Sequence, residues 1–70
     1  MLRQSVSSSN LSSVGYDTAT GTLEIEFHGG RVYRYSAVPV SVYSGLMGAA
    51  SKGSYFADFI KDIYPYIRVM

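Results

Sequence analysis

The clearest pattern in the chain is an alternation of apolar and charged side chains over residues 22–28. The apolar positions of this segment are Leu23, Ile25 and Phe27. Successive side chains of a β-strand point to opposite faces, so the pattern predicts a strand with one buried face. We expect Glu24 and Glu26, which have the opposite parity, to be exposed to water.

Two further strands are predicted beside this segment, over about residues 11–17 and 31–36. The connections are rich in Gly, Asp and Thr, which is typical of tight turns. Because short turns join neighbouring strands in opposite directions, the three segments are predicted to form an antiparallel meander.

The length of the second turn decides which face the tyrosines of the third strand occupy. A two-residue turn would pair Ile25 with Arg34 and so place a charge in the apolar layer. A three-residue turn, residues 28–30, pairs Ile25 with Tyr33 instead, and its glycines supply the left-handed backbone that such turns require. We therefore expect Tyr33 and Tyr35 to lie on the buried face.

Two helices are predicted after the strands, over about residues 39–50 and 54–64. Each shows an apolar stripe at the spacing of one helix face. The stripe residues are Tyr43, Leu46, Met47 and Ala50 in the first helix, and Phe56, Phe59, Ile60 and Ile63 in the second. Pro65 is expected to end the second helix.

The predicted fold is therefore α+β, with a three-stranded antiparallel sheet and two helices packed on one of its faces. Residues 66–70 are expected to be extended and either to add an edge strand or to pack over the helices. Residues 1–10 are Ser-rich and are predicted to be a flexible arm, so that residues 11–70 form a single domain.

Composition removes several classes of site. The chain has 70 residues and no cysteine, which excludes disulfides and thiolate metal ligands. No apolar run approaches the ~18 residues of a membrane helix, and no secretory signal is recognisable, so we expect a cytoplasmic protein with no membrane partner. The net charge is only +1, whereas nucleic-acid-binding domains usually carry a clear basic excess.

Catalytic chemistry finds little support in the sequence. The single histidine, His28, lies in a glycine turn, where an exposed loop residue is the favoured interpretation. Neither a metal-ligand spacing nor a nucleophile motif is present, so we expect no enzyme, no metal and no cofactor. Residues 50–56, which include Lys52, could receive an anion at a helix start, although capping serines between two helices are the favoured interpretation.

The aromatic residues, 14% of the chain, allow two interpretations. Tyr33-Arg34-Tyr35 has the alternating rings and cation of RNA-binding sheets, on which bases stack. The predicted register instead places both rings in the core, which is the favoured interpretation. The rings left most available for a partner are those of Tyr55, Tyr64 and Tyr66.

Several short segments follow one another in a characteristic order and spacing, namely residues 9–11, 14–17, 23–27, 33–35, 38–39 with Tyr43, 50–56, and Ile60 with residues 64–65. With these segments the sequence resembles, over about residues 6–68, the KTSC domain family, a short module at the C-terminus of some lysyl-tRNA synthetases and in stand-alone bacterial or phage proteins. Tyr33-Arg34-Tyr35 corresponds to the YxY of the family. The resemblance implies no established activity, and the synthetase context suggests RNA binding.

We therefore expect a small non-enzymatic binding module with RNA as its first candidate partner. The candidate binding residues are Arg31, Tyr33, Arg34, Tyr35, Lys52, Tyr55 and Lys61. The alternative is a protein-interaction or self-association domain, such as a homodimer, that uses an unpaired strand edge.

Overall fold

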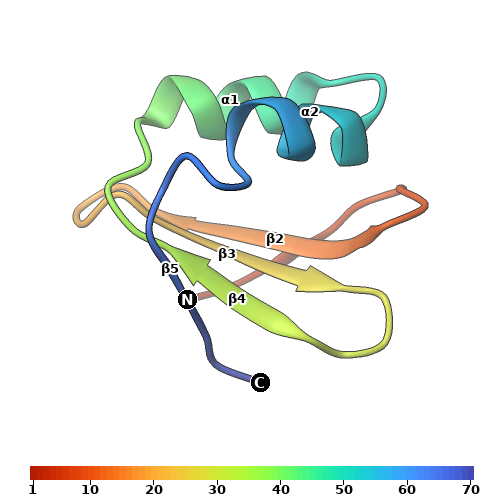
Figure 1. Ribbon diagram of the computed structural model, residues 1–70, viewed down its shortest axis with the longest axis horizontal. Coiled ribbons are helices and arrows are strands. Elements are labelled where there is room, and N and C mark those ends of the chain that lie inside the picture. Colours follow the sequence, from red (N-terminus) through yellow and green to blue (C-terminus); the bar gives the residue numbers. More distant parts are fainter.

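The computed structural model describes residues 1–70 and shows an antiparallel sheet covered on one face by two helices (Figure 1). The elements in chain order are β1 (Gln4–Ser5), β2 (Leu11–Asp17), β3 (Thr22–Phe27), β4 (Val32–Tyr35), α1 (Val40–Gly48), α2 (Lys52–Phe59) and β5 (Tyr66–Arg68). The strands lie in the order β1-β2-β3-β4-β5, so each strand pairs with its neighbour in the sequence.

The prediction of three strands was wrong, because the sheet has five. Strand β5 pairs with β4, which was one of the two arrangements expected for residues 66–70. Strand β1 comes from the Ser-rich arm and pairs with β2 through Gln4↔Val14 and Ser5↔Ser13. Such a short polar strand has no alternation of side chains to reveal it, since its pairing depends on backbone hydrogen bonds.

The predicted register between β3 and β4 is confirmed. Ile25 pairs with Tyr33 and Glu24 pairs with Arg34. The amide of Phe27 donates to the carbonyl of Arg31 at 2.8 Å across the turn, and Gly29 and Gly30 both have positive φ. This turn fixes which residues of both strands face the helices.

The core lies between the sheet and the helices. Its fully or almost fully buried members are Leu11, Val14, Leu23, Ile25, Tyr35, Val38, Leu46 and Ile60. Tyr35 is 4% exposed, which confirms its predicted place on the buried face, and Tyr33 is half-buried at the margin. At about 25 cal/mol per Å² of buried apolar surface, this layer provides most of the stability of the domain.

Helix α2 is shorter than predicted. It begins after Ser51, whose hydroxyl accepts a hydrogen bond from the Ser54 amide, and it ends at Phe59 rather than near residue 64. The next residues form a turn that includes Asp62 in the left-handed conformation. The chain leaves the helix early because it must return to the sheet as β5, so Ile63 is 58% exposed instead of buried.

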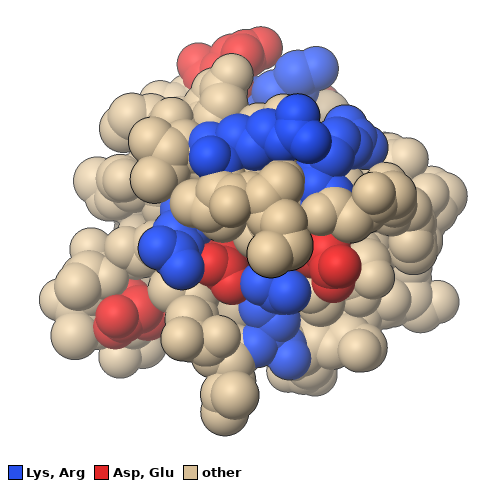
Figure 2. All heavy atoms as spheres, turned by 90° about the horizontal axis from the view of Figure 1, so that it is seen from below, with Lys and Arg blue, Asp and Glu red and all other residues tan.

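The face of the sheet away from the helices carries a cluster of charged side chains (Figure 2). Glu24 is only 3% exposed there, so its predicted exposure was wrong. Its carboxylate accepts hydrogen bonds from Arg3 Nη1 at 2.7 Å and from Arg34 Nε at 2.6 Å. Glu24 therefore links the N-terminal segment to β3 and β4.

The N-terminal segment covers this face closely. A Cβ atom at Gly15 would lie 2.7 Å from the carbonyl oxygen of Leu2, so only glycine allows the segment to cross β2 at this distance. Arg3 Nε also donates to Ser13 Oγ at 2.9 Å. The segment shields Glu24 from water, and it lies far from Glu24 in the sequence.

The pKa of Glu24 reflects two opposing effects. Burial alone would raise the pKa, but the hydrogen bonds and charges of Arg34 and Arg3 outweigh it and hold the pKa below the ordinary value of 4.5. The carboxylate is therefore ionised at neutral pH and contributes to stability in that form.

We predict that Glu24→Ala lowers the free energy of unfolding by about 2 kcal/mol, because it removes two charged hydrogen bonds from a buried position. The control is Glu26→Ala, since Glu26 is half-buried and its ion pair with Arg3 is a longer one of 3.9 Å. The control should cost less than about 1 kcal/mol. Urea denaturation measures both, and equal losses would contradict the special role of Glu24.

Glu24→Gln should also remove a pH-dependent part of the stability. A carboxylate whose pKa is lowered by folding stabilises the protein above the unfolded pKa, near 4.5, and this contribution is lost as the pH falls through the folded value. The difference in free energy of unfolding between wild type and Glu24→Gln should be largest near pH 6 and shrink towards pH 3. A difference that stays constant over this range would show that the Glu24 charge contributes nothing.

Candidate functional site

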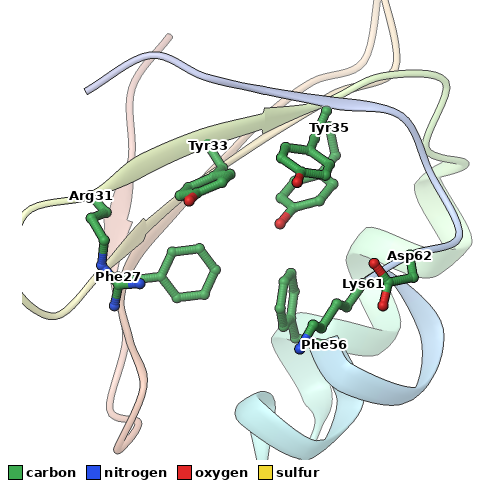
Figure 3. Close-up of a pocket in the computed structure, with 8 residues that line it drawn as sticks. Phe27, Arg31, Tyr33, Tyr35, Phe56, Lys61 and Asp62 are labelled. Carbon is green, nitrogen blue, oxygen red and sulfur yellow. The ribbon is translucent and has the colours of Figure 1, made fainter.

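One cleft opens on the helix side of the sheet, between β3, β4 and the end of α2 (Figure 3). Its volume is about 250 Å³. Its lining residues are Phe27, Arg31, Tyr33, Tyr35, Phe56, Lys61, Asp62 and Tyr66. We call it the aromatic cleft.

The rings of the aromatic cleft hold one another in place. Phe56 of α2 meets Phe27 edge to face at 5.2 Å between ring centroids and meets Tyr35 in the same way at 5.6 Å. Phe27 also meets Tyr33 edge to face at 5.7 Å. Edge-to-face contacts of this kind are favourable, so the walls of the cleft are preformed.

Tyr66 of β5 extends the aromatic wall. Its ring lies 5.4 Å from that of Tyr33 and 5.5 Å from that of Tyr35. Tyr66 is 54% exposed and Tyr33 is half-buried, so both rings remain accessible from outside the cleft. The cleft thus combines a fixed inner wall with two reachable rings at its margin.

Two cations stand at the rim of the aromatic cleft. The Arg31 guanidinium lies 5.6 Å from the centroid of Phe27, and its one hydrogen bond to the protein is a long one of 3.4 Å to the carbonyl of His28. Neither Arg31 nor Lys61 forms an ion pair. Asp62 is the one acidic residue of the lining, so the cleft carries a formal charge of +1.

A second, more polar hollow of about 430 Å³ adjoins the aromatic cleft. The two share four lining residues, namely Phe27, Arg31, Phe56 and Lys61. Ser9, Asn10 and His28 line the polar side. Arg31 and Lys61 therefore stand between a ring-lined space and a polar one.

The pKa of the Tyr35 phenol is raised to about 12. Burial is the main cause, and the neighbouring Tyr33, Tyr66 and Asp62 add to it. The phenol is therefore neutral at physiological pH, where it can donate a hydrogen bond into the cleft but carries no charge that would repel an anion.

The structure brings four of the predicted site residues together, namely Arg31, Tyr33, Tyr35 and Lys61. The other three lie elsewhere. Arg34 binds Glu24 on the opposite face, and Lys52 lines a separate Ser-rich hollow, where it donates to the carbonyl of Ala49. Tyr55 packs against Phe59 with 4.7 Å between ring centroids.

Sequence reasoning missed part of the cleft. The sequence predicts Phe27 and Phe56 on the apolar faces of their elements, and it gives Asp62 no role. Phe27 sits at the last position of its strand, beside the turn. The ring of Phe56 from α2 packs against it, and the segment after α2 supplies Lys61 and Asp62. An aromatic residue at the end of a strand, beside a glycine turn, is the signal that could have indicated this site.

Other chemistry is not supported by the geometry. His28 Nε2 lies 2.8 Å from the carbonyl oxygen of Ser8, which makes the ring part of a loop contact. No group of three acidic or histidine side chains is close enough to hold a metal ion. Neither helix combines the length and the apolar character that a membrane crossing requires.

Comparison with known proteins identifies relatives over the whole chain. An uncharacterized protein of Stutzerimonas stutzeri is 43% identical over 70 residues, and the match covers 99% of this chain and 99% of that protein. The crystal structure of a KTSC domain protein from Yersinia pestis superimposes with a TM-score of 0.93 at 38% identity, covering 99% of this chain and 97% of that one.

Part of the chain also matches much larger proteins. A lysine–tRNA ligase of Trichormus variabilis is 47% identical over 51 residues, which is 73% of this chain and 9% of the ligase. The ligase of a Nostoc strain gives 45% identity over the same length. None of these matches indicates a catalytic family for the present domain. The family model of the KTSC domain matches residues 7–64, and the chain therefore belongs to the KTSC domain family.

Proposed function

We propose that this chain is a non-enzymatic module that binds single-stranded RNA and takes one unpaired base into the aromatic cleft. The proposal rests on one observation. Aromatic rings from β3, β4, β5 and α2 line the same cleft as two cations that have no acidic partner. Sequence-tolerant binding of single strands uses this combination of rings and positive charge.

The size of the aromatic cleft suits a single base. Its volume of about 250 Å³ lies just below the range of roughly 300–1,000 Å³ that is typical of small-molecule pockets. The accessible rings of Tyr33 and Tyr66 offer stacking surfaces, and stacking of a base on an aromatic side chain contributes about 1–3 kcal/mol. The tyrosine hydroxyls can bond to the edge of the base.

The adjoining polar hollow suits the sugar and phosphate of the same nucleotide. Arg31 and Lys61 line both spaces, so they stand where a phosphate would leave the aromatic cleft. Contacts of this kind position a nucleic acid without reading its sequence. The expected ligand is therefore a short unpaired segment of unspecified sequence.

The low net charge of +1 is compatible with this role, because the cations are unevenly distributed. Arg3 and Arg34 are occupied by Glu24 on the opposite face, whereas Arg31 and Lys61 are unpaired. About two phosphates would be neutralised, which predicts a salt slope of about −1.4 for a single strand. Affinity should fall about sevenfold between 50 and 200 mM salt.

The relatives support RNA as the ligand class. Lysine–tRNA ligases act on a tRNA, as their name states, and 73% of this chain matches a segment of one. The same reasoning favours a cytoplasmic location. The alternative role in self-association depends on the open backbone edge of β5.

The proposal is tested by fluorescence anisotropy with a labelled ten-nucleotide RNA of mixed sequence in 50 mM salt, with a DNA of the same sequence in parallel. Lys61→Gln should weaken RNA binding at least threefold and reduce the salt slope by about 0.7. Tyr33→Leu should weaken binding at least fivefold, because it removes a stacking ring. Circular dichroism confirms that each variant is folded.

The matched control is Lys52→Gln, which makes the same change of charge outside the aromatic cleft. It should leave RNA affinity within twofold of wild type. The proposal fails if wild type shows no binding at about 100 μM protein, where ordinary non-specific binders are detected. It also fails if Lys52→Gln weakens binding as much as Lys61→Gln does.

A further inference from the structure

We propose that the exposed edge of β5 pairs with β5 of a second copy of this chain, around a twofold axis at Ile67. The pairing would join two five-stranded sheets into one continuous sheet. The pairing uses the backbone edge of β5 and can be measured without RNA, so either proposal can fail without the other.

The edge of β5 is open and unusually apolar. β5 is the last strand in the sheet order, and all three of its residues are exposed. The exposed apolar residues in and next to it are Ile63, Tyr66, Ile67, Val69 and Met70, with exposed fractions of 38–73%. Edge strands usually avoid such exposure because they attract other strands. The opposite edge, β1, has only Gln4 and Ser5.

The hydrogen bonds to β4 show which backbone groups of β5 are free. The carbonyl of Pro65 accepts from the Ser36 amide at 2.9 Å, and the Val69 amide donates to the carbonyl of Val32 at 2.8 Å. The odd-numbered residues of this segment therefore turn their backbone groups towards β4. Since these groups alternate along an antiparallel strand, Tyr66 and Arg68 turn theirs outwards. Met70 departs from the alternation, because both its N–H and its C=O bond to Val32.

A twofold axis at Ile67 uses these free groups. It places Tyr66 of one copy opposite Arg68 of the other, and both residues have outward-facing N–H and C=O groups. Such a pair exchanges two hydrogen bonds, and symmetry repeats them on the other side of the axis. A shift by one residue would oppose an inward-facing residue to an outward-facing one and lose these bonds.

The side chains select the same register. Ile67 then faces Ile67 of the second copy, which forms an aliphatic cross-strand pair. The ring of Tyr66 lies beside the guanidinium of Arg68 from the second copy, which suits a cation–π contact. An axis at Arg68 keeps the hydrogen-bond parity but opposes Arg68 to Arg68. An axis at Tyr66 also keeps it but opposes Ile67 to Pro65. Within β5 itself, the axis at Ile67 pairs two aliphatic side chains and sets Tyr66 against Arg68, and this self-complementarity favours a second copy as the occupant.

The symmetry also has a consequence for the aromatic cleft. A twofold axis between antiparallel strands is perpendicular to the sheet, so the helices of both copies lie on the same side. Tyr66 lines the aromatic cleft, and in the dimer Arg68 of the second copy would stand next to it. Each cleft would thereby gain a cation from the other copy.

Sedimentation velocity on the full chain between about 5 μM and 1 mM tests the proposal. We expect a monomer–dimer equilibrium that shifts towards monomer at least tenfold in Ile67→Lys, which opposes two lysines at the axis. Leu2→Lys is the matched control, because Leu2 is 95% exposed and its backbone lies against Gly15 of β2, which is not a neighbour of β5 in the sheet. It should associate like wild type.

A mixing experiment tests the position of the axis. Ile67→Lys and Ile67→Glu should each associate poorly alone, whereas their equimolar mixture should recover the dimer, because lysine then faces glutamate across the axis. Circular dichroism checks that both variants are folded. A wild type that stays monomeric up to 1 mM overturns the proposal, as does a mixture that stays monomeric or a loss in Leu2→Lys equal to that in Ile67→Lys.

Discussion

The register between β3 and β4 is the constraint on which the rest of the structure depends. The turn over residues 28–30 sets it, and a shift by one residue would move every side chain of β4 to the other face. With this register, Ile25 and Tyr33 face the helices, and Glu24 and Arg34 form a charged pair on the opposite face. Both the aromatic cleft and the charged cluster follow from the same short turn.

The charged side chains are paired on one face of the sheet and unpaired on the other. On the outer face, Glu24 binds Arg3 and Arg34, and this ties the N-terminal segment to the centre of the sheet. On the helix side, Arg31 and Lys61 have no acidic partner. The net charge of +1 is therefore the sum of two kinds of cation, those that bind Glu24 within the fold and those that have no acidic partner.

The sequence predicts best those features that side-chain parity determines. The alternation over residues 22–28 and the need to keep Arg34 out of the apolar layer were sufficient for the β3–β4 register. Parity could not reveal β1, because Gln4 and Ser5 pair through their backbone. Nor could it reveal the burial of Glu24, since the segment that covers this residue is distant in the sequence and has no periodic pattern. Local patterns specify faces, whereas coverage of a face depends on contacts between distant segments.

The early end of α2 explains why the cleft and the free edge occur together. A helix continuing to residue 64 would extend its apolar stripe beyond Phe59 and leave fewer residues for the return to the sheet. Because the helix stops at Phe59, residues 60–65 can return the chain to the sheet, where it adds β5. Strand β5 then supplies Tyr66 to the aromatic cleft and becomes the outermost strand. The accessible rings and the unpaired backbone groups are thus two consequences of one helix boundary.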